Sequence, residues 1–295
     1  MKLINININK YKYKMITIEI MGGLGNQLFQ IFNLISYGLI HKVPFYFEYK
    51  EKPEREDRPY YWSNFLGSLK PFLKKSYETN LPIYREKGFH YNKILPYSEI
   101  GKPFKFLGYF QSYKYFKENE EKILKLIKVD KEMENIKIKY KNMCNFEKTI
   151  SMHFRIGDYK NQQDNHPVMK VSYYISALKN IIEKTEESDW NILYFYEGQD
   201  VDLVKENVNI LQEKFKNITF TPINTEIVDY EQMLLMSLCK HNIIANSSFS
   251  WWGAYLNKNK NKIITYPNPN NWFGQSLGFK KMDDMFPESW YKILL

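Results

Sequence analysis

The stretch MITIEIMGGLGNQLFQIFNLI, residues 15–35, decides the fold class. Residues 15–20 alternate apolar and polar side chains, which is typical of a half-buried β-strand. Three glycines follow within four positions, and the apolar residues of 28–35 then recur with a helical period. A strand, a glycine-rich turn and a helix in this order open an α/β unit. The spacing differs from both G-x-G-x-x-G and the P-loop, since no Gly-Lys-Ser/Thr follows.

The glycines and the two amides after them form the first candidate site. Gly22, Gly23 and Gly25 allow positive φ and a close approach of the backbone to a ligand. The N-terminus of the following helix offers N–H groups to an anion. Asn26 and Gln27 would supply neutral hydrogen bonds to a phosphate or a hydroxyl. An equally weighted alternative is structural: a tight turn in which Asn26 caps the helix.

The rest of the chain repeats this alternation of strands and helices. Such alternation predicts parallel sheets joined by right-handed crossovers. Strands are expected at 45–49, 149–154, 192–197, 218–222, 242–246 and 262–267, and helices at 116–127, 172–184, 201–215, 230–239 and from 247 onward.

The chain of 295 residues is long enough for two domains. We expect an N-terminal domain over 15–147 and a C-terminal Rossmann-like domain over 148–295, divided where a charged segment ends. Residues 50–115 look irregular and aromatic. The Asn- and Lys-rich residues 1–14 are expected to be a disordered extension.

Composition excludes several classes of protein. Hydrophobic residues at 44% and charged residues at 25% are typical of a folded globular chain. The formal charge of +9 favours anionic partners, but the basic residues form no arm and no nucleic-acid module, so nucleic acid is not an expected partner. Two cysteines demand no disulfide framework. No apolar run approaches the roughly 18 residues of a membrane helix, and we expect a cytoplasmic protein without a transmembrane segment.

The second candidate site is HFRIGDY, residues 153–159, at the end of a predicted strand. An Arg at a strand end suits a diphosphate, because its planar guanidinium forms two charge-assisted bonds at once. Asp158 would hold Arg155 or His153 in place, or act as a base. The alternative is a surface Arg–Asp pair.

The third candidate site is NSSFSWWG, residues 246–253, where an apolar strand runs into a helix. Hydroxyls and backbone N–H groups at a helix start can cradle a phosphate. The alternative is an ordinary serine cap with the tryptophans in the core. The residues of interest are Asn246, Ser247, Ser248, Phe249 and Ser250.

Other acidic residues carry weaker signals. Asp200-Val-Asp202 matches the Asp-x-Asp of metal-dependent sugar transferases, but it stands at a helix start, where Asp caps the helix and complements its dipole. We therefore interpret it as capping. Asp283-Asp284 is expected in a solvated turn. No His/Cys/Asp cluster has metal-ligand spacing, and no G-x-S-x-G or Cys–His pattern indicates a covalent nucleophile.

Taken together, GGLGNQLFQ, HFRIGDY and NSSFSWWGAYL resemble the motifs of glycosyltransferase family 11, the α-1,2-fucosyltransferases. Residues 108–116 and 229–246 also look like family stretches. The resemblance implies a GT-B-like fold of two Rossmann-like domains whose parallel sheets face a cleft, with residues 15–147 on the acceptor side. It implies inverting transfer from GDP-L-fucose as co-substrate, without a cofactor or an obligatory metal. The implied acceptor is a galactose-terminated glycan, fucosylated at O2 of β-galactose.

The resemblance also assigns roles to residues. Arg155 would grip the donor diphosphate. Independently of the resemblance, a base could assist the acceptor hydroxyl, with Asp158 as the first candidate because it stands in the motif, and with His153, Asp164 and His166 as the others. Asp229 would bind guanine or ribose, or orient the loop at Asn246. The other implied donor-binding residues are Gly23, Gly25, Asn26, Gln27, Ser247, Ser248, Phe249 and Ser250.

The sequence departs from the family pattern at one position. The family usually has a second Arg directly after the first, and this chain has Ile156 there. A transferase for another GDP- or deoxy-sugar therefore stays open as an alternative. So does a non-catalytic protein that binds a nucleotide sugar or a glycan.

Overall fold

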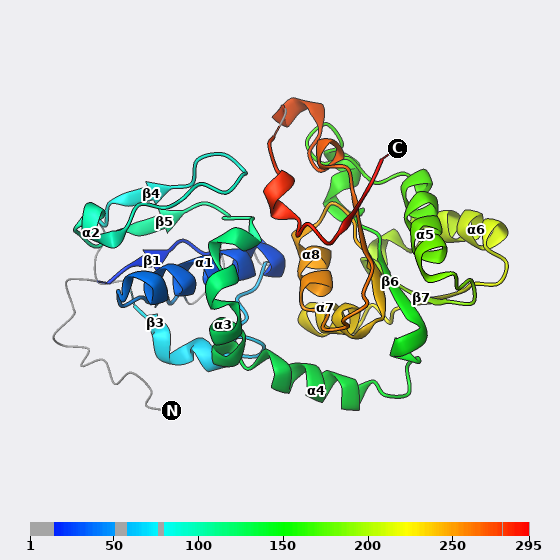
Figure 1. The fold of residues 1–295 in the computed structure, drawn as a ribbon, viewed down its shortest axis with the longest axis horizontal. Coiled ribbons are helices and arrows are strands. Elements are labelled where there is room, and N and C mark those ends of the chain that lie inside the picture. The colour runs from blue at the N-terminus through cyan, green and yellow to red at the C-terminus, as the bar shows by residue number, and fades with distance from the viewer. Residues whose placement is uncertain (1–14, 51–57, 76–79, 279, 295) are drawn as a thin grey trace. The chain divides into compact units, whose positions relative to one another are not determined.

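The computed structural model describes residues 15–50, 58–75, 80–278 and 280–294 (Figure 1). The predicted extension over 1–14 lies outside these residues. The chain forms two compact units. The first runs up to Asp130 and also includes Asp283–Met285, and the second begins at Lys131. Both units contain helices and parallel strands, so the predicted α/β class with parallel sheets is confirmed.

Helix α1 (Leu24–His41) is the core of the first unit. Its side chains from Gln27 to Gly38 are all buried, as expected of a helix that is apolar on most of its circumference. Strands β1, β5 and β4 form a parallel sheet in that order, and β2 pairs in parallel with β3. The bounds are β1 (Thr17–Ile18), β2 (Phe47–Glu48), β3 (Leu73–Lys74), β4 (Ile83–Arg85), β5 (Lys105–Leu107), α2 (Tyr97–Ile100) and α3 (Glu120–Ile127).

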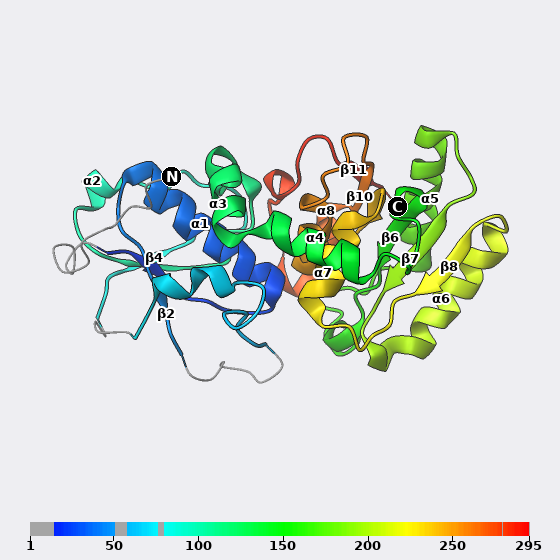
Figure 2. The ribbon, with the colours of Figure 1, turned by 90° about the horizontal axis from the view of Figure 1, so that it is seen from below.

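The second unit contains a six-stranded, wholly parallel sheet in the order β11-β10-β9-β6-β7-β8 (Figures 1 and 2). Counted within the unit, the strands stand in the order 6-5-4-1-2-3, the order of dinucleotide-binding Rossmann folds. The bounds are β6 (Thr149–His153), β7 (Asn191–Phe195), β8 (Thr219–Pro222), β9 (His241–Ile243), β10 (Ile264–Pro267), β11 (Tyr291–Ile293), α4 (Val129–Lys139), α5 (Val171–Thr185), α6 (Val201–Lys214), α7 (Asp229–Leu238) and α8 (Ser248–Tyr255).

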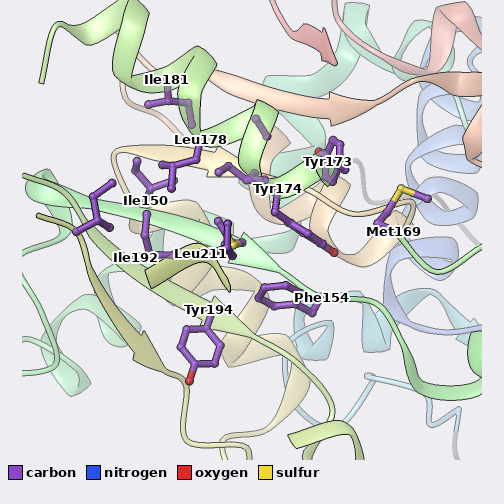
Figure 3. Packing of buried hydrophobic residues seen from close by; sticks show 14 of the residues in the cluster. Ile150, Phe154, Met169, Tyr173, Tyr174, Leu178, Ile181, Ile192, Tyr194 and Leu211 are labelled. Carbon is purple, nitrogen blue, oxygen red and sulfur yellow. The ribbon is translucent and has the colours of Figure 1, made fainter. Parts of the chain in front are cut away.

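Strand β6 lies in the middle of this sheet and is buried at all five residues. Its Ile150, together with Ile192 of β7, packs below α5, where Leu178 and Ile181 point toward the sheet (Figure 3). All four side chains are completely buried. Burial of such a side chain stabilises the fold by about 1.5–3 kcal/mol. This packing holds β6, and with it the residues that follow β6, in one position.

The boundary between the units differs from the predicted one at 147/148, because the charged segment after Asp130 belongs to the second unit. Lys139, at the end of α4, and Tyr140 both donate to the carboxylate of Glu231 on α7. Strand β11 was not predicted, nor were the strands within 50–115. They have only two or three residues each, too few for a period to show.

One carboxylate of the first unit shapes a family-like stretch. Glu86, directly after β4, accepts hydrogen bonds from the backbone N–H groups of Tyr109 (2.7 Å) and Phe110 (2.9 Å). Both Gly108 (φ 156°) and Phe110 (φ 53°) have positive φ, so the turn needs these two bonds to hold an uncommon conformation. Burial raises the pKa of Glu86 to about 7, although the two backbone bonds act in the opposite direction.

The raised pKa of Glu86 predicts a pH-dependent stability. Because the folded pKa exceeds the usual 4.5, the contribution of Glu86 is fully present below pH 4.5 and is lost as pH rises through about 7. Glu86→Gln keeps an acceptor but no charge, so its melting temperature relative to wild type should rise between those pH values. Thermal unfolding followed by circular dichroism across this range measures the difference. The exposed Glu99→Gln is the control, and an equal pH dependence of all three proteins would contradict the assignment.

Candidate functional site

The second and third predicted sites meet at the switch point of the second sheet. Strands β6 and β9 are neighbours, and from them the chain continues to opposite sides of the sheet. Ligands of open α/β sheets bind beyond the carboxyl ends of the strands at such a point. Arg155 follows β6, and Asn246 follows β9. The hydroxyl of Tyr159 donates to the backbone carbonyl of Asn246 (3.3 Å) and ties the two segments together.

The guanidinium of Arg155 lies between two carboxylates. It forms ion pairs with Asp158 and with Glu197, and its charged carbon lies 4.7 Å from the ring centre of Tyr159. The side chain of Arg155 is 12% exposed, against 40% for Asp158 and 44% for Glu197. The expected contact between Arg155 and Asp158 is present. An anion that binds Arg155 must therefore displace at least one of these two carboxylates.

Glu197 was missed by the sequence reasoning. It follows β7, which pairs with β6 in register from Thr149↔Asn191 to His153↔Phe195. Residues that follow neighbouring parallel strands share one edge of the sheet, so a prediction that the consecutive strands β6 and β7 pair would have placed Glu197 beside Arg155. The neighbouring Gly157 has φ +39°, and a Cβ there would lie 2.8 Å from the Glu197 carboxylate. Only glycine fits this loop without displacing Glu197.

The interpretation of Asp200 as a helix cap is wrong. Asp200 occupies the N-cap position of α6, yet its side chain makes no capping hydrogen bond. Instead the buried carboxylate accepts the backbone N–H of Gly157 (2.6 Å) and faces the ammonium of Lys160 (3.4 Å). Asp200 thus holds the loop that carries Arg155. Exposed Asp202 remains in the first turn of α6, where an acid complements the helix dipole.

His153 and Ile156 both point away from solvent. Burial, with a smaller contribution from the Arg155 charge, lowers the pKa of His153 to about 3, so the imidazole is neutral at ordinary pH. Its buried Nδ1 has no hydrogen-bond partner. The role of His153 as a base stays a prediction, and so does that of Asp158.

Ile156 is 4% exposed and packs in the hydrophobic core of the second unit, so its side chain lies away from Arg155's charged end.

The third predicted site contains the serine cap that its structural alternative expects. Ser247 is the N-cap of α8 and accepts the N–H of Phe249 (3.3 Å), and Ser250 is buried and donates to the Ser247 carbonyl (3.3 Å). Asn246 donates from its amide to the carbonyls of Pro167 (2.9 Å) and Trp272 (3.2 Å). Its buried Oδ1 has no hydrogen-bond partner. The other two residues, Ser248 and Phe249, are partly buried.

Asp229 lies apart from these residues along the chain, after β8. It is exposed as the first residue of α7, and its carboxylate accepts its neighbour's N–H, that of Tyr230 (2.7 Å). Its predicted contact with guanine or ribose stays a prediction. Because β8 is the last strand on the β7 side of β6, Asp229 follows the strand furthest from β9 on that side.

The glycine stretch of the first unit is organised by Gln27. Its amide donates to the carbonyls of Gly22 and Pro59, both at 2.9 Å, and the side chain is buried. Gly22 has φ +75°, and Gly23 is the N-cap of α1 without a side-chain cap bond. Asn26 is therefore not the cap of the helix, because it lies within the first turn.

The side chains of Asn26 and Arg58 also lie at the glycine stretch. The Oδ1 of Asn26 accepts the amide of Gln111 (2.8 Å), so residues 108–116 touch the glycine stretch directly. A Cβ on Gly23 would lie 3.4 Å from the guanidinium of Arg58. Arg58 was not singled out in the sequence, because nothing about its neighbours there distinguishes it. The structure places this cation beside the backbone of Gly23, while buried Gly25 lies inside α1.

In the part of the chain that the structure describes, no group of three or more His, Cys, Asp or Glu side chains is placed to hold a metal ion. No helix there is long and apolar enough to cross a membrane. The expectation of a solvated turn at Asp283-Asp284 is wrong for Asp284, whose carboxylate accepts the N–H of Tyr91 (2.8 Å) within the first unit.

The loop at Gly157 should depend on the carboxylate of Asp200. Asp200→Ala leaves a buried N–H without its acceptor, which costs about 1–3 kcal/mol, so the protein should unfold at a lower urea concentration. Asp200→Asn keeps an oxygen acceptor and should lose less. The control Asp202→Ala removes the neighbouring exposed acid of the same motif. Equal midpoints for the Asp200→Ala and Asp202→Ala proteins would show that the bond from Gly157 to Asp200 does not stabilise the loop.

Comparisons with known proteins agree with the motifs. The chain is 31% identical over 194 residues to an α-1,2-colitosyltransferase of Escherichia coli, covering 64% of this chain and 62% of the relative. It is 31% identical over 177 residues to the O-antigen biosynthesis glycosyltransferase WbnK of Escherichia coli, covering 56% and 54%. The matches therefore span less than two thirds of the length of either relative.

A more distant relative matches over more of its length. The chain is 25% identical over 328 aligned positions to a galactoside 2-α-L-fucosyltransferase of Caenorhabditis elegans, covering 99% of this chain and 85% of the relative. Among solved structures, a mutant of Arabidopsis thaliana FUT1 in complex with GDP has a TM-score of 0.48 at 12% identity, covering 94% of this chain and 76% of that one. The model of glycosyl transferase family 11 matches residues 4–293, and the chain belongs to this family.

Proposed function

We propose that the protein transfers L-fucose from GDP-L-fucose to O2 of a β-galactoside at the end of a glycan, with inversion at the sugar's C1. The observation that carries the proposal is the switch point of the second sheet, where Arg155 and the start of α8 lie together. The family and the names of the relatives support the same chemistry. The GT-B-like fold of two Rossmann-like domains is part of this proposal.

In the proposed reaction the C1–O bond to the diphosphate stretches, positive charge grows on the sugar ring, and negative charge grows on the departing GDP. Arg155 and the backbone N–H groups at the start of α8 would stabilise that negative charge. We propose that they do so without an obligatory metal. The acceptor hydroxyl attacks from the opposite face of the ring, which inverts the configuration at C1.

The acidic surround of Arg155 has a consequence for donor binding. Before the donor arrives, Asp158 and Glu197 neutralise the guanidinium and hold it in place. The incoming diphosphate would replace Glu197, which comes from another strand, while Asp158 from the same loop keeps the guanidinium oriented. This exchange makes binding selective for an anion that presents two oxygens to the guanidinium fork.

Another deoxy-sugar remains the second candidate donor, because one relative at 31% identity is named a colitosyltransferase. Ile156 does not decide between the donors, since its side chain is buried in the core. A non-catalytic binding protein is the less supported alternative, because the family to which this chain belongs is one of glycosyl transferases.

A donor panel tests the proposed reaction. The protein is incubated with GDP-L-fucose, GDP-colitose, GDP-mannose and UDP-galactose, each with lactose and N-acetyllactosamine, with and without EDTA. We expect GDP release and a new α-1,2-linked product with GDP-L-fucose, unchanged by EDTA. Transfer from GDP-colitose alone would replace the donor, and loss of turnover in EDTA would contradict the metal-free mechanism. GDP binding without turnover of any donor would support the binding protein.

Substitutions around Arg155 test the diphosphate role. Arg155→Ala should lower the transfer rate by about 10²-fold, since one preorganised charge-stabilising group contributes about 3 kcal/mol. Glu197→Gln should tighten GDP binding by a few-fold, because it removes a carboxylate that competes with the diphosphate for Arg155. The size of this effect corresponds to the free energy of one exposed ion pair. A transfer assay measures the rate of Arg155→Ala, and calorimetric titration measures the GDP affinity of both variants, with the exposed Glu213→Gln as the matched control. Unchanged GDP affinity in both variants would remove Arg155 from the diphosphate site.

A further inference from the structure

A cavity of about 670 Å³ lies within the second unit, outside the residues assigned to the donor. It is bounded by the loop after the Arg155 segment and by the segment that follows β10. Its volume is in the range of small-molecule sites, which run from about 300 to 1,000 Å³. The lining side chains that matter for its chemistry are Gln163, Asp164, Asn270, Phe273, Gln275 and Lys280.

Backbone contacts hold the two walls of this cavity together. The N–H of Gly274 donates to the Asn165 carbonyl (2.8 Å), and that of Ser276 donates to the Asp164 carbonyl (3.0 Å). A Cβ on Gly274 would lie 2.2 Å from the Asp164 carbonyl oxygen, so only glycine allows this contact. Asn246, a family-motif residue, donates to one carbonyl in each wall. The cavity is therefore built by the fold and is held by the same motif as the switch point.

A row of ring contacts connects this cavity with Arg155. The Arg155 guanidinium lies over Tyr159 (4.7 Å), Tyr159 stacks on His166 (4.7 Å between centroids, 18°), and His166 contacts Phe273 (5.5 Å). Burial lowers the pKa of His166, with Asp158 and Arg155 acting in opposite directions, so the imidazole in this row is mainly neutral at pH 7. The row places the cavity next to the proposed diphosphate site.

The strand order decides on which side of Arg155 the cavity lies. In the sheet, β6 and β9 stand between β10 on one side and β7 and β8 on the other. The cavity's second wall follows β10, on the other side of β6 and β9 from β7 and β8. If the diphosphate lies at Arg155 and the nucleoside extends toward β7 and β8, the cavity is on the side of the transferred sugar.

The lining suits a neutral polyhydroxylated ligand. Amide groups and a carboxylate supply donors and acceptors for vicinal hydroxyls, and Phe273 offers a ring face to the C–H groups of a sugar. Lys280 is the one cation among the lining residues that the structure describes, and the Asp164 carboxylate disfavours a phosphate there.

We propose that this cavity binds a neutral sugar residue of the glycan acceptor, an inference that rests on the proposed function. Acceptor recognition would then lie in the second unit, beside the donor, and would not be confined to residues 15–147. The acceptor hydroxyl would approach the donor sugar from the β10 side. Guanine, which a carboxylate and a ring can also bind, is the competing occupant that the experiment must separate.

The experiment fills the cavity with a bulky side chain. Asn270 is exposed on its rim, so Asn270→Trp should fill it without disturbing the core. The control Gln162→Trp adds the same bulk to an exposed residue one position before the lining residue Gln163. For each protein we would measure saturation transfer from the protein to methyl β-D-galactopyranoside by NMR, and GDP affinity by calorimetry. A transfer assay would give the acceptor KM, and the same assay without acceptor would give the rate of GDP release.

The proposal expects saturation transfer to the galactoside in wild type and in Gln162→Trp, and its loss in Asn270→Trp. The acceptor KM of Asn270→Trp should rise on the order of tenfold or more, while GDP affinity and acceptor-free GDP release stay unchanged. Weaker GDP binding in Asn270→Trp would overturn the proposal in favour of guanine. Equal saturation transfer in all three proteins, or none in wild type, would also overturn it. If no donor is turned over, the proposed function fails, and the NMR result still decides what the cavity binds.

Discussion

The parallel pairing of β6 with β7 on one side and β9 on the other is the constraint on which the second unit depends. Both faces of β6 are buried, and a shift by one residue would exchange the apolar Ile150 and Met152 with the polar residues of the opposite face. The residues after β6, β7 and β9 therefore meet at one edge of the sheet. Arg155, Glu197 and Asn246 owe their proximity to this pairing and not to their spacing in the chain.

Loop geometry then refines what the sheet brings together. Asp200, buried after β7, holds the backbone of Gly157, and Gly157 leaves room for the Glu197 carboxylate. Asn246 uses its amide to join two loops of the cavity. Several family-motif side chains thus act on the backbone, and only some are left to face a ligand. Gln27 does the same in the first unit, where its amide closes the glycine turn.

The charge arrangement around Arg155 connects structure with the proposed chemistry. A lone guanidinium in a partly buried site would be costly to desolvate, and the two carboxylates offset this cost. The same carboxylates lie close to the row of rings that leads to the cavity. A donor diphosphate at Arg155 and a neutral sugar in the cavity would be adjacent without sharing side chains.

The sequence by itself determined the α/β class, most strands and helices of the second unit, and the three motifs that identify the family. These features are local, because a period of two or 3.6 and a glycine cluster are visible within a few turns of chain. Only the tertiary structure decided that Asp200 supports a loop instead of capping α6, that Glu197 pairs with Arg155, and that residues 131–141 belong to the second unit. Each of these depends on contacts between residues far apart in the chain, which strand order and packing create and which no local pattern records.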